Sequence, residues 1–183
     1  LELQPKPDEW QRDLAKELVE MGVDAIIGHH PHVVQTIEFI NNVPVFYSIG
    51  NFIADAYLPN TAESIIVSFK INKGIENLKI KPIIIKDYFP EIVNENIQTS
   101  YLQDLLQYSN NIALIKKENA WSLKQMSKVD FKENTDSWFF SLGKYNVSIN
   151  KLNPKAHLLQ FYNNGNSSNS ICLHGELSEF HFS

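Results

Sequence analysis

Apolar positions recur with helical spacing at the start of the chain and with strand spacing over much of the rest. Residues 8–21 have the periodicity of an amphipathic helix, with Asp8 at its N-cap and Gly22 just after its end. The apolar run 23–27 follows and predicts a buried strand. We expect the helix to pack on the sheet through its apolar stripe, which consists of Trp10, Leu14, Leu18 and Met21.

Two β-hairpins are predicted next along the chain. They comprise residues 33–40 and 43–49 around the turn Asn41-Asn42, and residues 64–71 and 78–85 around the turn 72–74. The two asparagines tolerate the left-handed conformations that a tight hairpin turn requires. Pro82 lacks a backbone N–H, so it predicts an edge strand or a bulge in the second hairpin.

The chain divides into three regions by pattern. Residues 1–90 carry the helix, the first strand and both hairpins. Residues 91–136 are more polar and predict a connector with a short helix at 101–108. Residues 137–183 predict several short strands that form a small β-rich tail or module. The overall prediction is an α/β, β-rich fold.

Composition and charge narrow the possible partners. The 183 residues are 43% hydrophobic, as in a globular domain, and the net charge is −5. Arg12 is the only arginine and the lysines are scattered, which argues against nucleic acid as a partner. The sequence shows neither a targeting segment nor an apolar run of about 20 residues, the length that spans a bilayer. It starts at Leu1 without Met, so we expect a piece of a longer protein.

Three of the six histidines fall in one short loop. His29, His30 and His32 follow Gly28, directly after the first predicted strand. Ligand-binding loops gather at the carboxyl ends of strands in α/β sheets. Because Pro31 disfavours a helical conformation in the residue before it, we expect His30 to be extended and to project to the same side as His32.

The pair formed by His30 and His32 has two interpretations. Neutral imidazole is the commonest metal ligand in proteins, and a stiff two-residue spacing lowers the cost of organising two ligands. Alternatively, the segment is a polar turn whose histidines hydrogen-bond to backbone or water. The spacing alone favours neither interpretation.

Two motifs in this part of the chain resemble a known family. Residues 22–35, GVDAIIGHHPHVVQ, and residues 44–52, PVFYSIGNF, are similar to the bacterial capsule-synthesis family. This is the CapA or PgsA-like, poly-γ-glutamate-associated group of metallophosphoesterase-like proteins. Two motifs in the right order are more specific than a lone histidine pair. The resemblance covers about residues 1–60.

The resemblance implies the C-terminal part of a calcineurin-like metallophosphoesterase sandwich, with an additional small β-rich region at the C-terminus. Carried over to this sequence, His30 and His32 match the family's His-x-His metal ligands, and His29 is a further candidate ligand. Asn51 and Gly28 are expected to contact a ligand or the substrate, although Asn51 is equally suited to capping its own turn. The resemblance assigns no catalytic residue.

The implied cofactors are divalent metal ions, Mn, Zn, Fe or Mg, two of them in the full-length protein. The family takes its other ligands from an Asp-rich strand end, an Asn-His motif and a His-Trp-Gly-like element, all of which we expect upstream of Leu1. A two-histidine remnant binds metal weakly. Residues 1–183 alone are therefore expected to be inactive even if the parent protein is an enzyme.

Two functions follow from the resemblance. One is metal-dependent hydrolysis of a phosphoester, or a related step in making or anchoring an anionic surface polymer. The other is a non-catalytic assembly or polymer-binding role in the same pathway with a vestigial metal site, because similarity of fold does not establish hydrolysis. Either function implies the extracytoplasmic face of the bacterial cell envelope and membrane-bound capsule-synthesis machinery as a partner.

Overall fold

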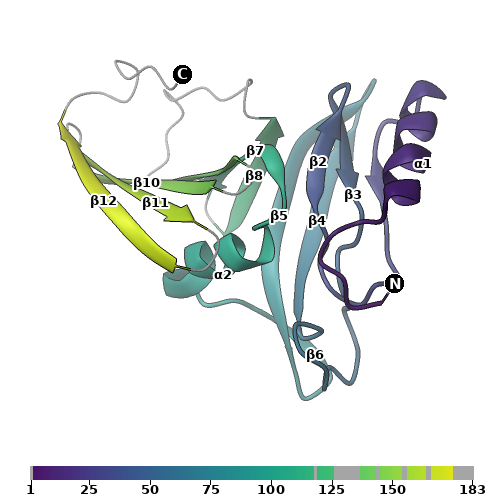
Figure 1. Cartoon of the computed structure of the whole chain (residues 1–183), viewed down its shortest axis with the longest axis horizontal. Coiled ribbons are helices and arrows are strands. Elements are labelled where there is room, and N and C mark those ends of the chain that lie inside the picture. Colours follow the sequence, from purple (N-terminus) through teal and green to yellow (C-terminus); the bar gives the residue numbers. More distant parts are fainter. Residues whose placement is uncertain are drawn as a thin grey trace.

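The computed structural model describes residues 2–117, 119–125, 137–142, 145–153, 156–163 and 166–174 (Figure 1). Its helices are α1 (Glu9–Glu20), the 3-10 helix η1 (Glu95–Ile97) and α2 (Gln98–Leu105). Its strands are β1 (Ile26–Ile27), β2 (Ile37–Ile40), β3 (Val43–Phe46), β4 (Glu63–Ile71), β5 (Ile75–Lys86), β6 (Phe89–Ile92), β7 (Asn110–Lys117), β8 (Ala120–Gln125), β9 (Ser137–Leu142), β10 (Tyr145–Asn153), β11 (Ala156–Asn163) and β12 (Asn166–His174).

A small sheet in the order β1-β3-β2 carries the first predicted hairpin. β2 and β3 pair antiparallel around Asn41 and Asn42, whose φ angles of 49° and 70° are the left-handed values expected for the turn. β1 runs parallel to β3, so both strands end at the same edge. The strands are shorter than predicted, and residues 33–36 precede β2 as buried loop rather than as strand.

The larger sheet has nine described strands in the order β12-β11-β10-β9-β7-β8-β5-β4, with β6 also paired to β5. The hairpin of β4 and β5 is confirmed, but β5 is not an edge strand, because it has neighbours on both sides. Pro82 lies between the residues of β5 that pair with β8 and those that pair with β6. Its missing N–H therefore falls at a break in the ladder.

Residues 91–125 contain a short helix and two strands of the larger sheet. The expected short helix is present as α2, three residues earlier than predicted, and β7 and β8 lie inside the larger sheet. Strands β9 to β12 follow, as the alternating pattern of residues 137–174 predicts. β12 begins at Asn166 and ends at His174. Residues 175–183, the last part of the predicted β-rich tail, lie outside the described residues.

The core joins both sheets to α2. It contains Ile37 and Phe46 from the small sheet, Ile80 and Trp121 from the larger sheet, and Leu102 from α2, each at most 1% exposed. Two hydrogen bonds reinforce this junction, since the Ile37 N–H donates to Ser109 Oγ at 2.9 Å and Thr36 Oγ1 donates to the Tyr108 carbonyl at 3.4 Å. The small sheet is therefore held firmly against the larger one.

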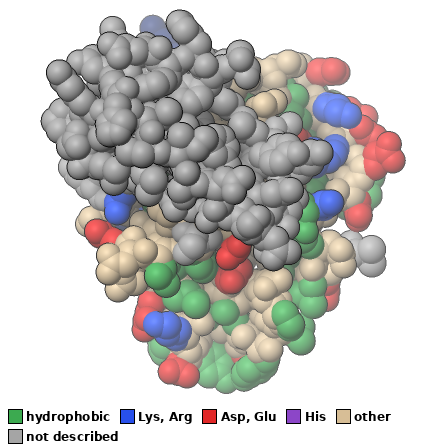
Figure 2. Space-filling view, turned by 60° about the vertical axis from the view of Figure 1, so that its left-hand side comes forward, with side chains coloured by type: hydrophobic (Ala, Val, Ile, Leu, Met, Phe, Trp, Pro, Cys, Tyr) green, Lys and Arg blue, Asp and Glu red, His purple; other side chains and the backbone are tan. Residues whose placement is uncertain are grey.

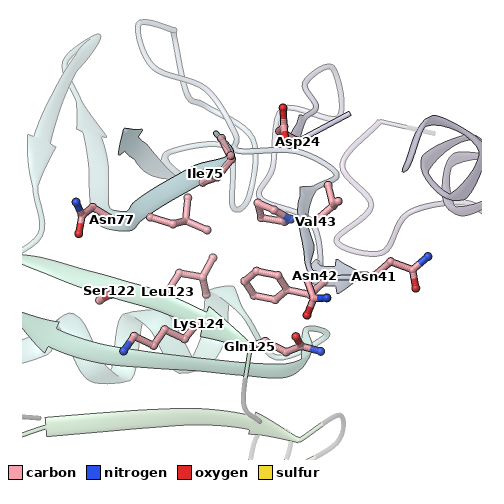
Figure 3. Close-up of a pocket in the computed structure, with 14 residues that line it drawn as sticks. Asp24, Asn41, Asn42, Val43, Ile75, Asn77, Ser122, Leu123, Lys124 and Gln125 are labelled. Carbon is pink, nitrogen blue, oxygen red and sulfur yellow. The ribbon is translucent and has the colours of Figure 1, made fainter. Parts of the chain in front are cut away.

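The described surface has two notable features. Hydrophobic side chains are exposed at the end that carries β6, toward the bottom of Figure 2. A cavity of about 590 Å³ opens between the β2–β3 turn, the β4–β5 turn and β8 (Figure 3).

No helix of the described residues is long and apolar enough to cross a membrane.

Helix α1 forms where predicted but packs through a different face. Trp10, Leu14 and Met21 are 64%, 45% and 79% exposed, whereas Ala15 and Val19 are buried. The prediction that the Trp10 stripe packs on the sheet is therefore wrong. There are two reasons. The small Ala15 lets the helix approach the sheet closely, and the ion pair of Arg12 with Glu38 holds the same face of the helix against the sheet.

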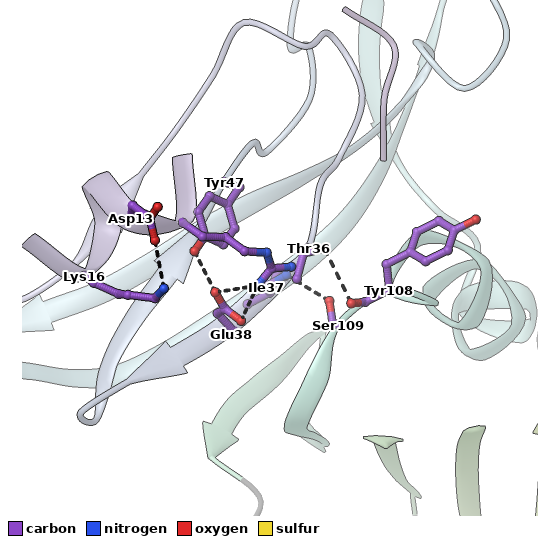
Figure 4. A network of polar contacts seen from close by, with 9 residues as sticks. Asp13, Lys16, Thr36, Ile37, Glu38, Tyr47, Tyr108 and Ser109 are labelled. Carbon is purple, nitrogen blue, oxygen red and sulfur yellow. Dashed lines mark hydrogen bonds and ion pairs between the residues drawn. The ribbon is translucent and has the colours of Figure 1, made fainter. Parts of the chain in front are cut away.

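One polar network orients α1 on the small sheet (Figure 4). Arg12 Nη1 lies 3.0 and 2.9 Å from the two carboxylate oxygens of Glu38 on β2. Tyr47 donates its hydroxyl to Glu38 at 2.6 Å, and the Arg12 guanidinium lies 5.5 Å from the centre of the Tyr47 ring. The face of α1 that carries Arg12 and Ala15 must therefore turn toward the sheet.

The molecule as a whole is β-rich, with two sheets and few helices among the described residues. This architecture is consistent with a partial α/β metallophosphoesterase-like fold. The division into regions 1–90, 91–136 and 137–183 stays a prediction.

Candidate metal centre

The histidine loop lies at the edge of the small sheet where β1 and β3 both end. The Gly28 N–H donates to the Phe46 carbonyl at 2.7 Å, and the Gly28 carbonyl accepts from the Ile49 N–H at 3.3 Å. These bonds continue the β1–β3 pairing past the last strand residues. A Cβ at position 28 would collide with the Tyr47 carbonyl group, so only glycine allows this approach. Gly28 thus positions the loop through its backbone.

The histidines come together, but not in the predicted conformation. His30 and His32 have φ angles of 98° and 62°, so the expectation of an extended His30 is wrong. A hydrogen bond from the Leu3 N–H to the Pro31 carbonyl, 2.9 Å long, holds the loop between them. The two rings nevertheless approach each other, with centroids 6.1 Å apart.

A carboxylate completes the group. One potential ligand atom each from Glu2, His30 and His32 lies within 4.8 Å of the others, and all three side chains are exposed. Among the described residues these are the three that assemble in this way. Sequence spacing could not find Glu2, because it is 28 residues away from His30 and belongs to no local pattern.

Gln35 explains how Glu2 reaches the histidines. Its Nε2 donates to the Gln4 carbonyl at 2.9 Å and to the Lys6 carbonyl at 3.1 Å, and the Gln35 side chain is buried. The Thr36 N–H also donates to the Pro5 carbonyl at 3.3 Å. The N-terminal segment is therefore tied along residues that follow the histidine loop.

Asn51 contacts the site directly. Its Oδ1 lies 2.9 Å from His32 Nδ1, and its Nδ2 donates to the Thr61 carbonyl at 3.2 Å. The second bond fixes the orientation of the amide, so Oδ1 accepts and His32 Nδ1 carries a hydrogen. In neutral His32 the lone pair is then on Nε2. Gly50, with φ at 81° and no room for a Cβ, places Asn51 there.

The histidines line a cavity of about 470 Å³. His29, His30 and His32 form one side, and the segment after β3 and the first half of β4 form the rest. Phe52 and Ile53 line it too and are 53% and 71% exposed. The predicted residues His29, His30, His32 and Asn51 therefore all line one open cavity. Gly28 is not among the lining residues and holds the histidine loop through its backbone hydrogen bonds.

The donor set suits a transition metal. Two imidazoles and one carboxylate are ligands for Zn²⁺, Mn²⁺ or Fe²⁺, whereas Mg²⁺ prefers oxygen ligands and retains several waters. The hydrogen bond to Asn51 is the outer contact that a metal-binding histidine ordinarily makes through its other nitrogen. The residues present therefore fit a divalent metal of the implied kind.

Comparisons with known proteins agree with the two motifs. Residues 1–56 match the family model described as bacterial capsule synthesis protein PGA_cap. These findings support a CapA-like capsule biosynthesis family for this part of the chain. The matched residues include the histidine loop, Gly50, Asn51 and Glu2.

Curated relatives of this family extend the similarity. The PGA biosynthesis protein CapA of Bacillus subtilis is 36% identical over 107 residues, which cover 57% of this chain and 28% of that protein. The capsule biosynthesis protein CapA of Bacillus anthracis is 34% identical over 130 residues, covering 70% of this chain and 30% of that protein. An uncharacterized protein of Sinorhizobium fredii, y4sH, is 42% identical over 50 residues, covering 27% of this chain and 11% of that protein. The chain thus spans less than a third of the length of the CapA relatives it matches.

Proposed function

We propose that this chain supplies part of a divalent metal site to a phosphoesterase-like protein of capsule or poly-γ-glutamate synthesis. The observation that carries the proposal is the convergence of Glu2, His30 and His32 on one point in an open cavity. Two of these residues are the ligands that the family motif indicates. The third comes from an independent segment, which a polar turn with no ligand would not require.

Each residue has a distinct part in the proposed chemistry. A bound pair of divalent cations would supply charge stabilisation to a phosphoryl group and a nucleophile at neutral pH. Glu2, His30 and His32 would hold the metal, and Asn51 would keep His32 Nε2 directed at it. His29 lines the same cavity as a further candidate ligand. The exposure of the site suits a large substrate, such as an anionic polymer or its phosphoester precursor.

The proposal includes a place in the cell. A capsule-related role, together with the family, supports the extracytoplasmic face of the bacterial cell envelope and contact with membrane-bound synthesis machinery. Fractionation of cells expressing the native protein, followed by protease treatment of intact protoplasts, tests this part. Protection of the protein from external protease would contradict it.

The ligand assignment is tested by metal titration. We expect Zn²⁺ or Mn²⁺ affinity, measured by isothermal titration calorimetry, to fall at least tenfold in His30→Ala, His32→Ala and Glu2→Gln. The matched control is His157→Ala, which replaces a histidine on β11 and should leave the metal affinity unchanged. Unchanged metal binding in both loop-histidine variants would refute the assignment.

A second function is favoured by the small size of the ligand group. The described residues gather three ligand side chains, whereas a two-metal hydrolytic site needs more. We therefore expect no turnover of p-nitrophenyl phosphate with Mn²⁺ by these 183 residues alone. In the full-length protein, chelator-sensitive turnover that is lost in His32→Ala supports the enzyme. Metal binding without turnover there supports an assembly or polymer-binding role instead.

A further inference from the structure

The histidine cavity combines two kinds of lining. The three histidines and Asn51 supply polar groups, whereas Phe52, Ile53 and residues 65–67 of β4 supply apolar ones. No lysine or arginine is among the described residues that line it. The cavity therefore offers one place for a charged group, next to the proposed metal ligands, and apolar surface for the rest of a ligand.

Phe52 and Ile53 are the exposed part of this apolar lining. Each is more than half exposed, although burial of a large apolar side chain stabilises a fold. Asn51 fixes the start of their segment, because its side chain hydrogen-bonds to both His32 and the Thr61 carbonyl. Exposed apolar side chains that lie together on a surface are typical of ligand-binding grooves. The two residues are thus held beside a proposed metal ligand and are available to a bound molecule.

The apolar surface continues beyond the cavity. Further large side chains that are more than half exposed lie in the same segment and at the turn between β5 and β6, namely Tyr57, Leu58, Tyr88 and Phe89 (Figure 2). A hydrogen bond of 2.7 Å between the Tyr57 and Tyr88 hydroxyls joins these two parts of the chain. A long apolar ligand that leaves the cavity would therefore find a surface to follow.

The charges along this surface disfavour an anionic polymer. The charged residues of segments 52–58 and 86–92 are Asp55, Lys86, Asp87 and Glu91. Lys86 forms an ion pair of 2.9 Å with Glu91, so the net charge of the two segments is negative. A polyanion would be repelled here, because its binding requires a surplus of cations. An uncharged apolar chain meets no such repulsion.

We propose that the substrate of this site is a phosphoester of a long apolar alcohol. The phosphate would lie at the metal ligands Glu2, His30 and His32, and the first carbons of the alcohol would lie against Phe52 and Ile53. This inference rests on the proposed metal site, because a phosphate needs a cation and the described lining contains no lysine or arginine. It narrows the substrate from anionic polymers in general to lipid-like phosphoesters.

Binding of alkyl phosphates tests the proposal. Ethyl, butyl and hexyl phosphate are titrated into the 183-residue chain at a Zn²⁺ concentration that saturates the site, and affinity is measured by isothermal titration calorimetry. Each CH₂ group that leaves water can raise affinity up to about fourfold, so we expect a gain of at least about tenfold from ethyl to hexyl phosphate. Zn²⁺ binding with equal affinity for all three phosphates would overturn this inference alone. A chain that binds no Zn²⁺ would refute the metal site as well.

A double substitution tests the apolar contact. Phe52→Ser combined with Ile53→Ser changes two exposed side chains, so the fold should be retained. We expect hexyl phosphate to bind this variant at least about tenfold more weakly than the wild type, which removes most of the dependence on alkyl length. Ile71→Ser is the matched control, because Ile71 is exposed at the other end of β4 and does not line the cavity. It should keep the full gain from ethyl to hexyl phosphate, and a double variant that also keeps it would contradict the proposal.

Discussion

Gly28 links the histidine loop to the sheet, and its role rests on the missing side chain. Its backbone bonds to Phe46 and Ile49 require a close approach to the Tyr47 carbonyl. The Tyr47 carbonyl belongs to the backbone, so it cannot move aside as a flexible side chain would. The sequence predicted that Gly28 lies beside the site. In the structure its backbone hydrogen bonds hold the loop against β3.

We expect Gly28→Ala to destabilise the protein by about 2 kcal/mol or more, since the new Cβ would overlap backbone atoms. Gly22→Ala is the matched control. Gly22 has φ at 94°, but a Cβ there would meet nothing within 4 Å, so the substitution should cost only about 1 kcal/mol of backbone strain. Urea unfolding at pH 7 measures both, and equal losses would contradict the role of the close approach.

Asn51 is the residue that orients the His32 ring and favours one of its two tautomers. We expect Asn51→Ala to lower Zn²⁺ affinity about 10- to 100-fold, because His32 loses the partner that fixes its ring. Asn51→Asp keeps an acceptor at the same place and should recover much of the affinity. Calorimetric titration of the two variants checks this, and equal affinities for Ala and Asp would exclude a role through the hydrogen bond.

Two tyrosines, the buried Tyr47 and the half-buried Tyr101, predict how stability depends on pH. Burial raises the pKa of Tyr47 well above its usual value of 10.0, and the hydrogen bond to Glu38 raises it further. Burial likewise raises the pKa of Tyr101, whose hydroxyl donates to the Ile83 carbonyl at 2.5 Å. Above about pH 10 the unfolded state loses phenol protons that the folded state keeps. The free energy of unfolding should therefore fall as pH rises above about 10.

We expect Tyr47→Phe to reduce this alkaline loss, by up to about 1.4 kcal/mol per pH unit for a single group. At pH 7 the same variant should cost about 1 kcal/mol through the lost hydrogen bond to Glu38. Urea unfolding at pH 8 and pH 11 separates the two effects. An identical pH slope for the variant and the wild type would contradict the assignment to Tyr47.

At the scale of elements, helix α1 shows what periodicity predicts and what it leaves open. The pattern of residues 8–21 predicted the helix nearly to the residue, because its caps and spacing are local properties. It indicated the wrong face, because the most hydrophobic stripe need not be the one that packs. The ion pair of Arg12 with Glu38 joins residues 26 apart, and no local pattern encodes it.

The face of α1 that packs can be tested by substitution. We expect Ala15→Leu to destabilise the protein by about 1–3 kcal/mol, because Ala15 is buried in a cluster with Val45 and Tyr47 and a larger side chain must displace its neighbours. Leu14→Ala, one residue away and 45% exposed, should change stability by less than about 1 kcal/mol. Urea unfolding ranks the two, and the reverse order would restore the face predicted from the sequence.

At the scale of the whole molecule, the sequence predicted the local units and missed their assembly. Both hairpins, α1, α2 and most C-terminal strands follow from periodicity and turn residues. The insertion of β7 and β8 into the larger sheet does not, since strand order depends on contacts between distant residues. For the same reason the motif indicated His30 and His32, whereas Glu2 emerged only from the fold.

Trp121 packs in the core that the two sheets share with α2. It is 1% exposed in the shared core, and its Nε1 donates to Gln98 Oε1 at 3.0 Å. Gln98 in turn donates to the Val93 carbonyl at 2.8 Å. Trp121→Phe would leave a void and an unpaired buried acceptor together. We expect a loss of about 2–4 kcal/mol, whereas Trp10→Phe on the exposed face of α1 should stay within about 0.5 kcal/mol.

Native-state hydrogen exchange shows whether the stability lost in Trp121→Phe is lost in both sheets or in one. Ile37 lies in the small sheet and Ile80 in the larger one, and both belong to the core that contains Trp121. If the two sheets unfold as one unit, Trp121→Phe should lower the exchange free energies of both amides by the same amount. A loss confined to Ile80 would mean that the small sheet, with its histidine loop, is stable without the larger sheet. The histidine loop would then keep its conformation without the larger sheet, although part of the wall of its cavity comes from β4.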